Sequence, residues 1–342
     1  MKVLTFGEIM LRLKAPNHER LFQSPVLEAT FGGAEANVAV SLANFGMETA
    51  FLTVLPEKNT VSDACIRELR SFGVDVSGIC FGPGRMGIYY LESGANQLPG
   101  KVVYDREGSS MAIAEPGSVN WQNALSGVSW LHLSGITPAL SEHAMELSLE
   151  CIHEAKANGI TVSFDLNYRK NLWKYGKAAE TVLPEFIRCS DIVIASEDEV
   201  QEIFQIPTDI SENSGRPETE KYHEISDKIL AGYPNVKMLA VILRESKSTD
   251  SNGWTSCLND RKRFYCSRKY DIEDIVDRVG VGDSFAAGLI CGLCSYDDAE
   301  KALEFAAAAS CLKHSIPGDF NRVDKTDVEK LMSGNVTGRV QR

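Results

Sequence analysis

The sequence predicts an α/β protein built on a doubly wound parallel sheet, and two observations lead to this fold class. First, short β-rich runs alternate with longer stretches of helical periodicity, as in a sheet assembled from βαβ units. Second, two stretches interrupt this alternation and carry the pattern of β-hairpins instead. The expected strands of the main sheet, each followed by a helical segment, are 3–7, 49–55, 130–133, 161–166, 192–195 and 238–243.

The two interrupting stretches are residues 11–33 and 87–108, where apolar and polar residues alternate and no helix of useful length fits. Neither hairpin would be stable alone, so we expect both to form one small β-sheet lid over a cleft. The main α/β domain would then comprise 1–10, 34–86 and 109–342. A polar segment, 208–224, is expected to be a surface excursion.

Composition limits the classes of partner. Of 342 residues, 44% are hydrophobic, and 35 basic against 47 acidic residues give a net charge of -12, which opposes binding to nucleic acid or to anionic membranes. The longest apolar run, 285–294, is too short to span a membrane, and Glu8 interrupts any signal-peptide core. We therefore expect a cytoplasmic protein whose nine cysteines are reduced. An anionic ligand would need a local cluster of basic groups.

A G-x-G-D motif formed by Gly280, Val281, Gly282 and Asp283 opens the most apolar helix of the sequence. Glycines there allow a tight turn whose amides, together with the helix dipole, can bind phosphate oxygens. Asp283 could accept a proton from a hydroxyl that attacks the phosphoryl group. The alternative is an aspartate N-cap beside glycines in an ordinary loop, and the motif alone does not decide between the two.

Two further segments offer polar groups for a ligand. Gly33 and Asn37 flank the start of a helix of small residues, where a ligand hydroxyl could reach the backbone, although a glycine turn before a tightly packed helix explains them equally well. Asp165, Asn167 and Arg169 alternate at the end of a strand, so they project to one side, where open α/β sheets bind ligands. An internal ion pair between Asp165 and Arg169 is the less favoured interpretation, because these residues end the strand.

The lid contributes aromatic and basic candidates. Tyr104 and Arg106 can face the same way, whereas Tyr89 and Tyr90 point to opposite faces, so only one of those two can line the cleft. A core tyrosine pair with a surface arginine is the alternative. The acidic start of the helix at 196–199 could hold Mg²⁺ directly or through water, or could simply complement the helix dipole.

Other motifs are excluded. A G-x-G-x-x-G match at 82–87 precedes a strand and contains a proline, so it lacks the context of a dinucleotide site. The six histidines show no metal-ligand spacing. The missing dinucleotide fingerprint argues against a dehydrogenase.

The order of these motifs resembles that of the ribokinase-like, or PfkB-type, sugar kinases over nearly the whole chain. The most specific stretch is 277–285, in which Val281 stands where the family usually has alanine. Other stretches are similar to the branch that contains the 2-keto-3-deoxygluconate kinases, namely 31–37, 132–140, 165–169 and 316–321. The resemblance implies a three-layer αβα fold with a small β-sheet lid.

The resemblance also implies residue roles. Asp283 would be the base, and the amides of Gly280, Val281 and Gly282 would hold the charge on the transferred phosphoryl group. The implied sugar site consists of Gly33, Asn37, Tyr89, Tyr104, Arg106, Asn167, Arg169 and Asp283. The implied ATP site consists of Ser196, Arg244, Ser246, Gly253, Gly280 and Gly282.

Two cations and two departures from the family pattern complete these implications. Glu199 would act on Mg²⁺ through a bound water, and Asp277 lies where some relatives bind a monovalent cation such as K⁺. Ser196 replaces the asparagine that often begins the acidic motif. The loop after 238–243 reaches a glycine only at Gly253, so the ATP pocket is expected to be built differently there.

The implied activity is ATP- and Mg²⁺-dependent phosphorylation of 2-keto-3-deoxygluconate at its primary hydroxyl, giving the 6-phosphate. Alternative substrates are the galacto epimer, 5-keto-2-deoxygluconate, fructose and ribose. The alternative from another class is a sugar- or nucleotide-binding regulator that has lost turnover. Relatives often pair their lids across a dimer, so we also expect a homodimer through the lid, with no nucleic-acid or membrane partner.

Overall fold

A nine-stranded sheet forms the centre of the main domain in the computed structural model, which describes residues 1–206, 218–246 and 248–334. The strand order is β14-β13-β12-β11-β10-β9-β1-β4, with β15 also paired to β13. The strands from β4 to β12 run parallel, and β13 is antiparallel to β12. Their bounds are β1 (Lys2–Phe6), β4 (Glu48–Leu52), β9 (Val128–Ser134), β10 (Thr161–Asp165), β11 (Ile192–Ser196), β12 (Met238–Ser246), β13 (Asn252–Asn259), β14 (Phe264–Cys266) and β15 (Tyr270–Ile272).

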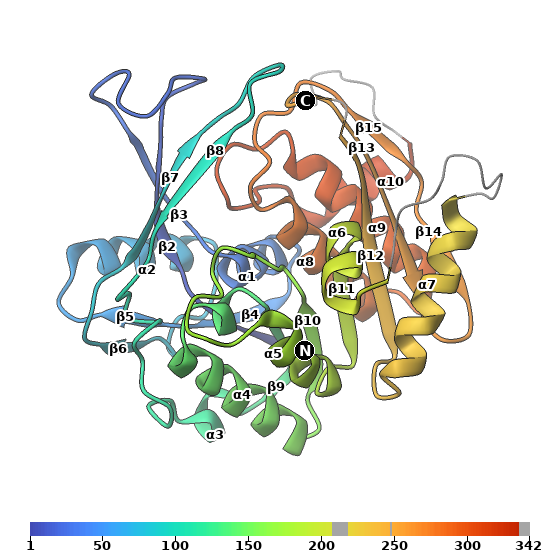
Figure 1. Cartoon of the computed structure of the whole chain (residues 1–342), viewed down its shortest axis with the longest axis horizontal. Helices are drawn as coiled ribbons and strands as arrows, with labels where there is room; N and C mark the ends of the chain where they lie inside the picture. The colour runs from blue at the N-terminus through green and yellow to red at the C-terminus, as the bar shows by residue number, and fades with distance from the viewer. Residues whose placement is uncertain (207–217, 247, 335–342) are drawn as a thin grey trace.

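Helices cover both faces of this sheet and complete the predicted three-layer αβα architecture (Figure 1). One face carries α1 (Ala34–Asn44), α8 (Val281–Ser295), α9 (Ala299–Lys313) and α10 (Lys325–Met332). The other face carries α3 (Trp121–Ala124), α4 (Glu142–Ala157), α5 (Ala179–Arg188), α6 (Glu197–Phe204) and α7 (Glu218–Gly232). A further helix, α2 (Thr60–Ser71), packs beside α1 near the β4 edge.

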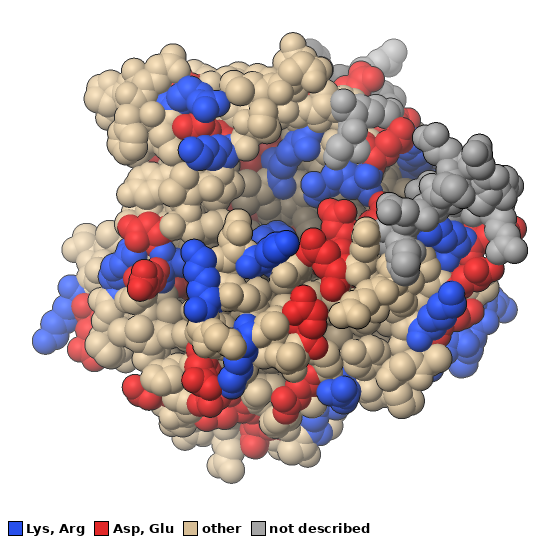
Figure 2. Space-filling view, viewed as in Figure 1, with Lys and Arg blue, Asp and Glu red and all other residues tan. Residues whose placement is uncertain are grey.

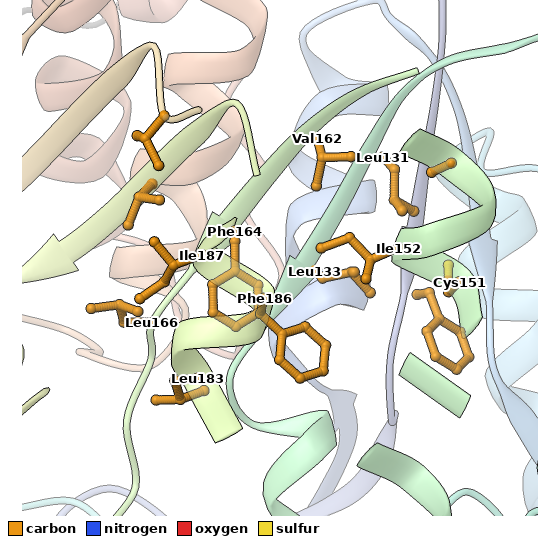
Figure 3. Packing of buried hydrophobic residues seen from close by; sticks show 14 of the residues in the cluster. Leu131, Leu133, Cys151, Ile152, Val162, Phe164, Leu166, Leu183, Phe186 and Ile187 are labelled. Atoms are coloured by element: carbon orange, nitrogen blue, oxygen red, sulfur yellow. The ribbon is translucent and has the colours of Figure 1, made fainter. Parts of the chain in front are cut away.

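The core beneath α4 and α5 illustrates why the strands are apolar along their length. Phe164 of β10 stacks on Phe186 of α5, with ring centroids 5.3 Å apart, and the side chains around this pair are buried (Figure 3). Because helices cover both faces of the sheet, the side chains on both faces of each strand are buried among apolar groups.

Close packing of α8 on α9 needs glycine, since a Cβ at Gly288 would lie 2.7 Å from the Cα of Ala306. Cys291 of α8 is buried within this helix pair.

The sequence prediction differs from the structure at three places. The expected strand 49–55 is divided into β4 and β5 (Val54–Pro56), and β5 leaves the main sheet to pair with β6 (Cys80–Gly82). The strand β12 continues into the antiparallel strand β13 instead of a helix, since the polar residues after it offer no apolar helical face. Of the expected surface segment 208–224, residues 208–217 lie outside the described residues, and the remainder begins α7.

The predicted second sheet is present and has four strands in the order β3-β2-β7-β8. These are β2 (Met10–Lys14), β3 (Glu28–Gly32), β7 (Gly87–Glu92) and β8 (Lys101–Asp105). Two antiparallel hairpins meet in a parallel pairing of β2 with β7. The sheet rises from one side of the main domain (Figure 1). Within the described residues, no helix is long and apolar enough to cross a membrane.

Candidate active site

A cavity of about 640 Å³ lies between the lid and the main domain. The face drawn in Figure 2 is hollowed there, and basic and acidic side chains gather at the rim of the hollow. Side chains from the ends of β10, β11 and β12, from the start of α8 and from β7 and β8 line the cavity. This is the carboxyl edge of the parallel strands, where α/β sheets bind their ligands.

The glycine turn, residues 280–282, opens α8 on the cavity wall. Gly280 has φ 78°, a conformation that favours glycine, and a Cβ there would lie 2.3 Å from the carbonyl oxygen of Asp319. A Cβ at Gly282 would meet nothing within 4 Å, so its backbone is open to a ligand. The turn therefore presents the N-terminus of a 15-residue helix to the cavity, which favours an anion.

Asp283 follows this turn and is 8% exposed. Its Oδ2 accepts a hydrogen bond of 2.7 Å from Nδ2 of Asn37. Burial raises the pKa of Asp283 to about 6, and the nearby carboxylate of Asp319 adds to this, while Asn37, Arg169 and Lys313 oppose it. A carboxylate with this pKa is largely ionised at neutral pH and can still accept a proton. The plain N-cap interpretation does not hold, because the N-cap of α8 is Gly280.

Gly33 and Asn37 lie together at the start of α1, and both line the cavity. A Cβ at Gly33 would lie 2.2 Å from the carbonyl oxygen of Glu8, so glycine is needed for close packing there. The Asn37 side chain accepts from the amide of Gly33 at 3.3 Å while it donates to Asp283. Asn37 thus positions the carboxylate of Asp283, and it keeps a second N–H for a ligand.

Asp165, Asn167 and Arg169 all line the cavity, as their alternation predicts. Asp165 accepts from the backbone amide of Asn167 at 3.2 Å and from its Nδ2 at 3.4 Å. Arg169 is exposed, and its Nη1 donates to the carbonyl oxygen of Tyr168 at 3.1 Å. No carboxylate of the described residues lies within 4.0 Å of its guanidinium, so Arg169 is a cation free to meet an anionic ligand.

The lid residues divide into two kinds. Tyr89 faces the cavity, as does Tyr104, and their ring centroids are 6.0 Å apart. The hydroxyl of Tyr89 donates to Asp319. Arg106 also lines the cavity, but it is 8% exposed and its Nε donates to Oε2 of Glu8 at 2.7 Å. The guanidinium of Arg106 therefore forms a direct ion pair within the protein, whereas that of Arg169 has no carboxylate of the described residues within 4.0 Å.

The residues expected on the nucleotide side are only partly brought together. Ser196 and Arg244 line the cavity, and the guanidinium carbon of Arg244 lies 5.4 Å from the ring centroid of Trp254. Ser246 ends β12, where its backbone pairs with Asn252. Gly253 of β13 lies opposite Glu245 of β12 and is not among the residues that line the cavity.

The family of this chain follows from its similarity to known proteins. A model of the pfkB family of carbohydrate kinases matches residues 1–231 and 252–323. The chain belongs to this family. It is a carbohydrate kinase, which transfers a phosphoryl group to an alcohol acceptor.

Individual relatives of this pfkB kinase cover almost the whole chain. A solved 2-dehydro-3-deoxygluconokinase from Thermotoga maritima is 44% identical, with a TM-score of 0.90 over 98% of this chain and 100% of that one. The 2-dehydro-3-deoxygalactonokinase of Haloferax volcanii is 30% identical over 98% of both chains. A putative ribokinase from E. coli, solved with ATP and Mg²⁺, is 20% identical over 97% of this chain and 99% of that one, with a TM-score of 0.77, and it shares the fold.

Kinases of the pfkB family bind ATP with Mg²⁺, and the acidic groups of the cavity fit such a cation. Burial raises the pKa of Glu199 and, still more, that of Asp165, and these two carboxylates and Asp283 have Arg169 as their nearby cation. Glu199 accepts from the backbone amides of Tyr168 at 2.6 Å and Ser196 at 2.7 Å, which leaves outer lone pairs for water. In the described residues no group of three acidic, histidine or cysteine side chains could hold a metal ion.

Four polar residues of this kinase were missed by reasoning from sequence. Glu8 pairs with Arg106, and Arg12 of β2 is 1% exposed with Nη1 2.7 Å from Asp319 and Nη2 2.5 Å from Asp277. Arg12 gave no signal except a charge between the apolar residues of an alternating strand, which usually indicates a solvent-facing position. Asp319 lies in a stretch that resembles the family, but nothing local indicates its ionic partner.

Glu35 is the fourth such residue, and it links two segments next to the cavity. Its Oε1 accepts hydrogen bonds from the amide and hydroxyl of Ser134 and from the hydroxyl of Thr137. Burial raises the pKa of Glu35 to about 7. The carboxyl group thereby joins the start of α1 to the segment after β9, next to the cavity wall at Ile136.

Proposed function

We propose that this kinase transfers the γ-phosphoryl group of ATP to the primary hydroxyl of 2-keto-3-deoxygluconate and forms its 6-phosphate. The observation that carries the proposal is Arg169, an exposed guanidinium without a carboxylate partner on the wall that also holds Asp283. In a chain of net charge -12, an exposed guanidinium that makes no direct ion pair suits a sugar that carries a carboxylate. A neutral sugar would not need it.

In the proposed reaction, Asp283 accepts the proton of the attacking hydroxyl while Asn37 holds its carboxylate in place. The amides of residues 280–282 stabilise the charge that develops on the phosphoryl oxygens. Mg²⁺, when bound, would neutralise charge on the phosphates, and Glu199 would orient its water ligands. Arg169 binds the sugar carboxylate, and the lid residues Tyr89 and Tyr104 exclude water that would otherwise hydrolyse ATP.

A second sugar acid is favoured by one relative. The Haloferax volcanii protein, named for the galacto epimer, is 30% identical to this chain. Arg169 would bind the carboxylate of either epimer, because the two acids differ in stereochemistry and not in charge. We place 2-keto-3-deoxygluconate first, since the solved relative named for that substrate is 44% identical.

The test is an ADP-release assay with ATP and Mg²⁺ over a panel of sugars: 2-keto-3-deoxygluconate, its galacto epimer, 5-keto-2-deoxygluconate, gluconate, fructose and ribose. We expect the highest kcat/KM with 2-keto-3-deoxygluconate. Preference for a neutral sugar would contradict the role of Arg169 and leave the kinase assignment intact. ATP binding without turnover of any sugar would favour a regulator that has lost catalysis.

Replacement of Arg169 by Met provides the residue-level test. The loss of a charge-assisted bond to a carboxylate costs about 1.5–3 kcal/mol, so kcat/KM for the sugar acid should fall roughly 10- to 100-fold with little change in KM for ATP. Arg169→Lys should recover part of the loss. Arg188→Met, which removes an exposed arginine at the end of α5, is the control and should behave as the wild type. An unchanged kcat/KM in Arg169→Met would refute the proposed carboxylate site.

A further inference from the structure

Lys313 is a completely buried lysine at the end of α9, with 0% exposure. Its Nζ donates to two backbone carbonyl oxygens, that of Ile316 at 3.0 Å and that of Gly318 at 2.8 Å. Lysine is almost never fully buried unless partners hold its charge. The ammonium group thus lies against two backbone oxygens of the turn that follows its own helix.

This ammonium lies directly behind the glycine turn. The position of a Cβ on Gly280 would be 3.3 Å from Cε of Lys313 and 2.3 Å from the carbonyl oxygen of Asp319. The carboxylates of Asp277, Asp319 and Asp283 all favour its charged form. Lys313 therefore supports the turn that presents amides to the cavity, from the side opposite the ligand.

The oxygens around Asp277 do not fit the monovalent cation that the family resemblance implies. Oδ2 of Asp277 accepts from Arg12 at 2.5 Å and from the amide of Gly318 at 3.0 Å, and Oδ1 accepts from the amide of Val279 at 3.0 Å. Lys313 occupies the two carbonyl oxygens next to them. A potassium ion would have to displace the guanidinium or the ammonium group to reach these ligands.

We propose that the ammonium group of Lys313 is a built-in monovalent cation that positions the glycine turn and makes phosphoryl transfer independent of added K⁺. Two cations, Arg12 and Lys313, here balance two carboxylates, Asp277 and Asp319. Loss of the ammonium charge would leave a net negative charge directly behind the phosphate site. Lys313 is thus a positioning residue, since it acts through Gly280 and touches no reacting group.

The protonation state of Lys313 is compatible with this role. Burial lowers the pKa of Lys313 to about 8, while Asp277 and Asp319 act in the opposite direction and Arg12 adds to the lowering. The ammonium form therefore predominates near pH 7. We accordingly place the test near neutral pH.

The test compares wild type with Lys313→Met in buffers whose only cations besides Mg²⁺ are bulky organic ones, with KCl, NH₄Cl or choline chloride added at equal ionic strength. Methionine ends where the ammonium group begins, so it removes the charge and leaves room for an ion. We expect wild-type kcat to change by less than about twofold on addition of K⁺. The kcat of Lys313→Met should fall by roughly 10- to 100-fold and be restored in large part by K⁺ or NH₄⁺, but not by choline.

A second measurement does not depend on turnover. K⁺ and NH₄⁺ should raise the Tm of Lys313→Met and leave the Tm of wild type unchanged, because only the variant has a vacant cation position. Lys177→Met, which removes an exposed lysine paired with Glu142, is the control and should respond as wild type does.

Two results would overturn the proposal: strong activation of wild type by K⁺, or a folded Lys313→Met with full turnover in the absence of K⁺. If the variant does not fold, the response of wild type to K⁺ still decides. The inference relies on the kinase assignment but not on one sugar, so the assay uses whichever sugar of the panel is turned over fastest. A wrong substrate is thereby distinguished from a wrong role for Lys313.

Discussion

The carboxylate of Asp283 is buried, yet a general base must be ionised before it can accept a proton. Three groups reduce this conflict: Asn37 donates a hydrogen bond, and the positive charges of Arg169 and Lys313 favour the ionised form. Their combined effect leaves the pKa at about 6, above the ordinary range of an aspartate. Asp283 is therefore mostly ionised at neutral pH, and its carboxylate is still a stronger base than that of an ordinary aspartate.

Asp283→Asn should lower kcat by about 10²- to 10⁴-fold, the usual contribution of a general base, with KM for ATP nearly unchanged. Because deprotonation creates the base, kcat/KM of wild type should rise with pH through about 6 and then level off. Steady-state assays with the preferred sugar measure both effects. Asp75→Asn, at a carboxylate paired with Lys2 away from the cavity, should retain wild-type turnover and pH dependence.

Asp283→Asn should also change how the free energy of unfolding depends on pH, because the folded and unfolded states bind the Asp283 proton differently. The folded-state pKa of Asp283, about 6, exceeds the ordinary value of 3.8, so the native state holds a proton that the unfolded state has lost between these values. Relative to Asp283→Asn, wild type should lose stability as the pH rises from about 4 to 6, by up to about 3 kcal/mol. Urea unfolding at the two ends of this range measures the difference. The role of Asp283 as base would be contradicted if kcat/KM did not fall below about pH 6, or if the stability difference between wild type and Asp283→Asn did not change with pH.

At the scale of elements, the turn that opens α8 contains two glycines with different requirements. Gly280 has a positive φ and no space for a Cβ, whereas Gly282 has neither constraint. Gly280→Ala should therefore destabilise the fold by more than about 2 kcal/mol, since the strained conformation alone costs about 1–2 kcal/mol. Gly282→Ala should unfold like wild type and lose turnover, because its methyl group enters the space left for the ligand. Denaturant titration and kcat of both variants test this contrast, and equal stabilities would refute it.

The lid is joined to the main domain by buried charges. On the face of the lid toward the cavity, Arg12 lies beside Tyr89, and both contact Asp319, whose carbonyl group touches Gly280. A change in lid position would therefore reach the glycine turn through Asp319, and also through Asp277, which pairs with Arg12 and accepts from the amide of Val279.

Arg12→Met should destabilise the protein by about 3–5 kcal/mol, because it leaves the carboxylates of Asp277 and Asp319 buried without their cation. Faster hydrogen exchange in β2 and β7 should accompany the loss, and both effects can be measured on the intact chain. Lys14→Met, on the same strand with a weaker pair at 3.5 Å to exposed Glu28, should change stability by less than about 1 kcal/mol. Similar losses in both variants would mean that burial of the Arg12 pair is unimportant.

Local sequence patterns predict some features of the site. Contacts between residues far apart in the sequence cannot be predicted in this way. Alternation placed Tyr104 and Arg106 on one face, and the G-x-G-D pattern located the start of α8, because both are properties of short stretches. The partners of Arg12 are 265 and 307 residues away, and Glu8 is 98 residues from Arg106. Local sequence patterns therefore cannot predict these ion pairs. Gly253 was placed in the ATP site by resemblance, and its position opposite Glu245 follows from the hairpin of β12 and β13, which periodicity did not predict.

At the scale of the whole molecule, the outer face of the lid carries one apolar row between rows that include charged residues. Leu13, Tyr90 and Val103 form one row across β2, β7 and β8, and Val103 is 40% exposed. We propose that this face meets the lid of a second copy, since an exposed apolar sheet face favours association.

Sedimentation equilibrium should therefore give the mass of a homodimer. Val103→Glu should give a monomer, because it buries a charge in the proposed interface. Val26→Glu, at another exposed apolar residue of the lid segment outside this row, should remain a dimer. A monomeric wild type would contradict the proposal.

The pairing of β2 with β7 also determines when the lid can form during synthesis. Met10 pairs with Gly87, so the N-terminal strand has to wait for the α/β unit between them before the sheet can close. Arg12 waits longer still, because its two carboxylate partners lie 265 and 307 residues further along the chain. Until then its guanidinium has no buried partner, so this ion pair does not yet stabilise the docked lid. The first strand of the lid is thus translated well before the segments that hold it in its native place.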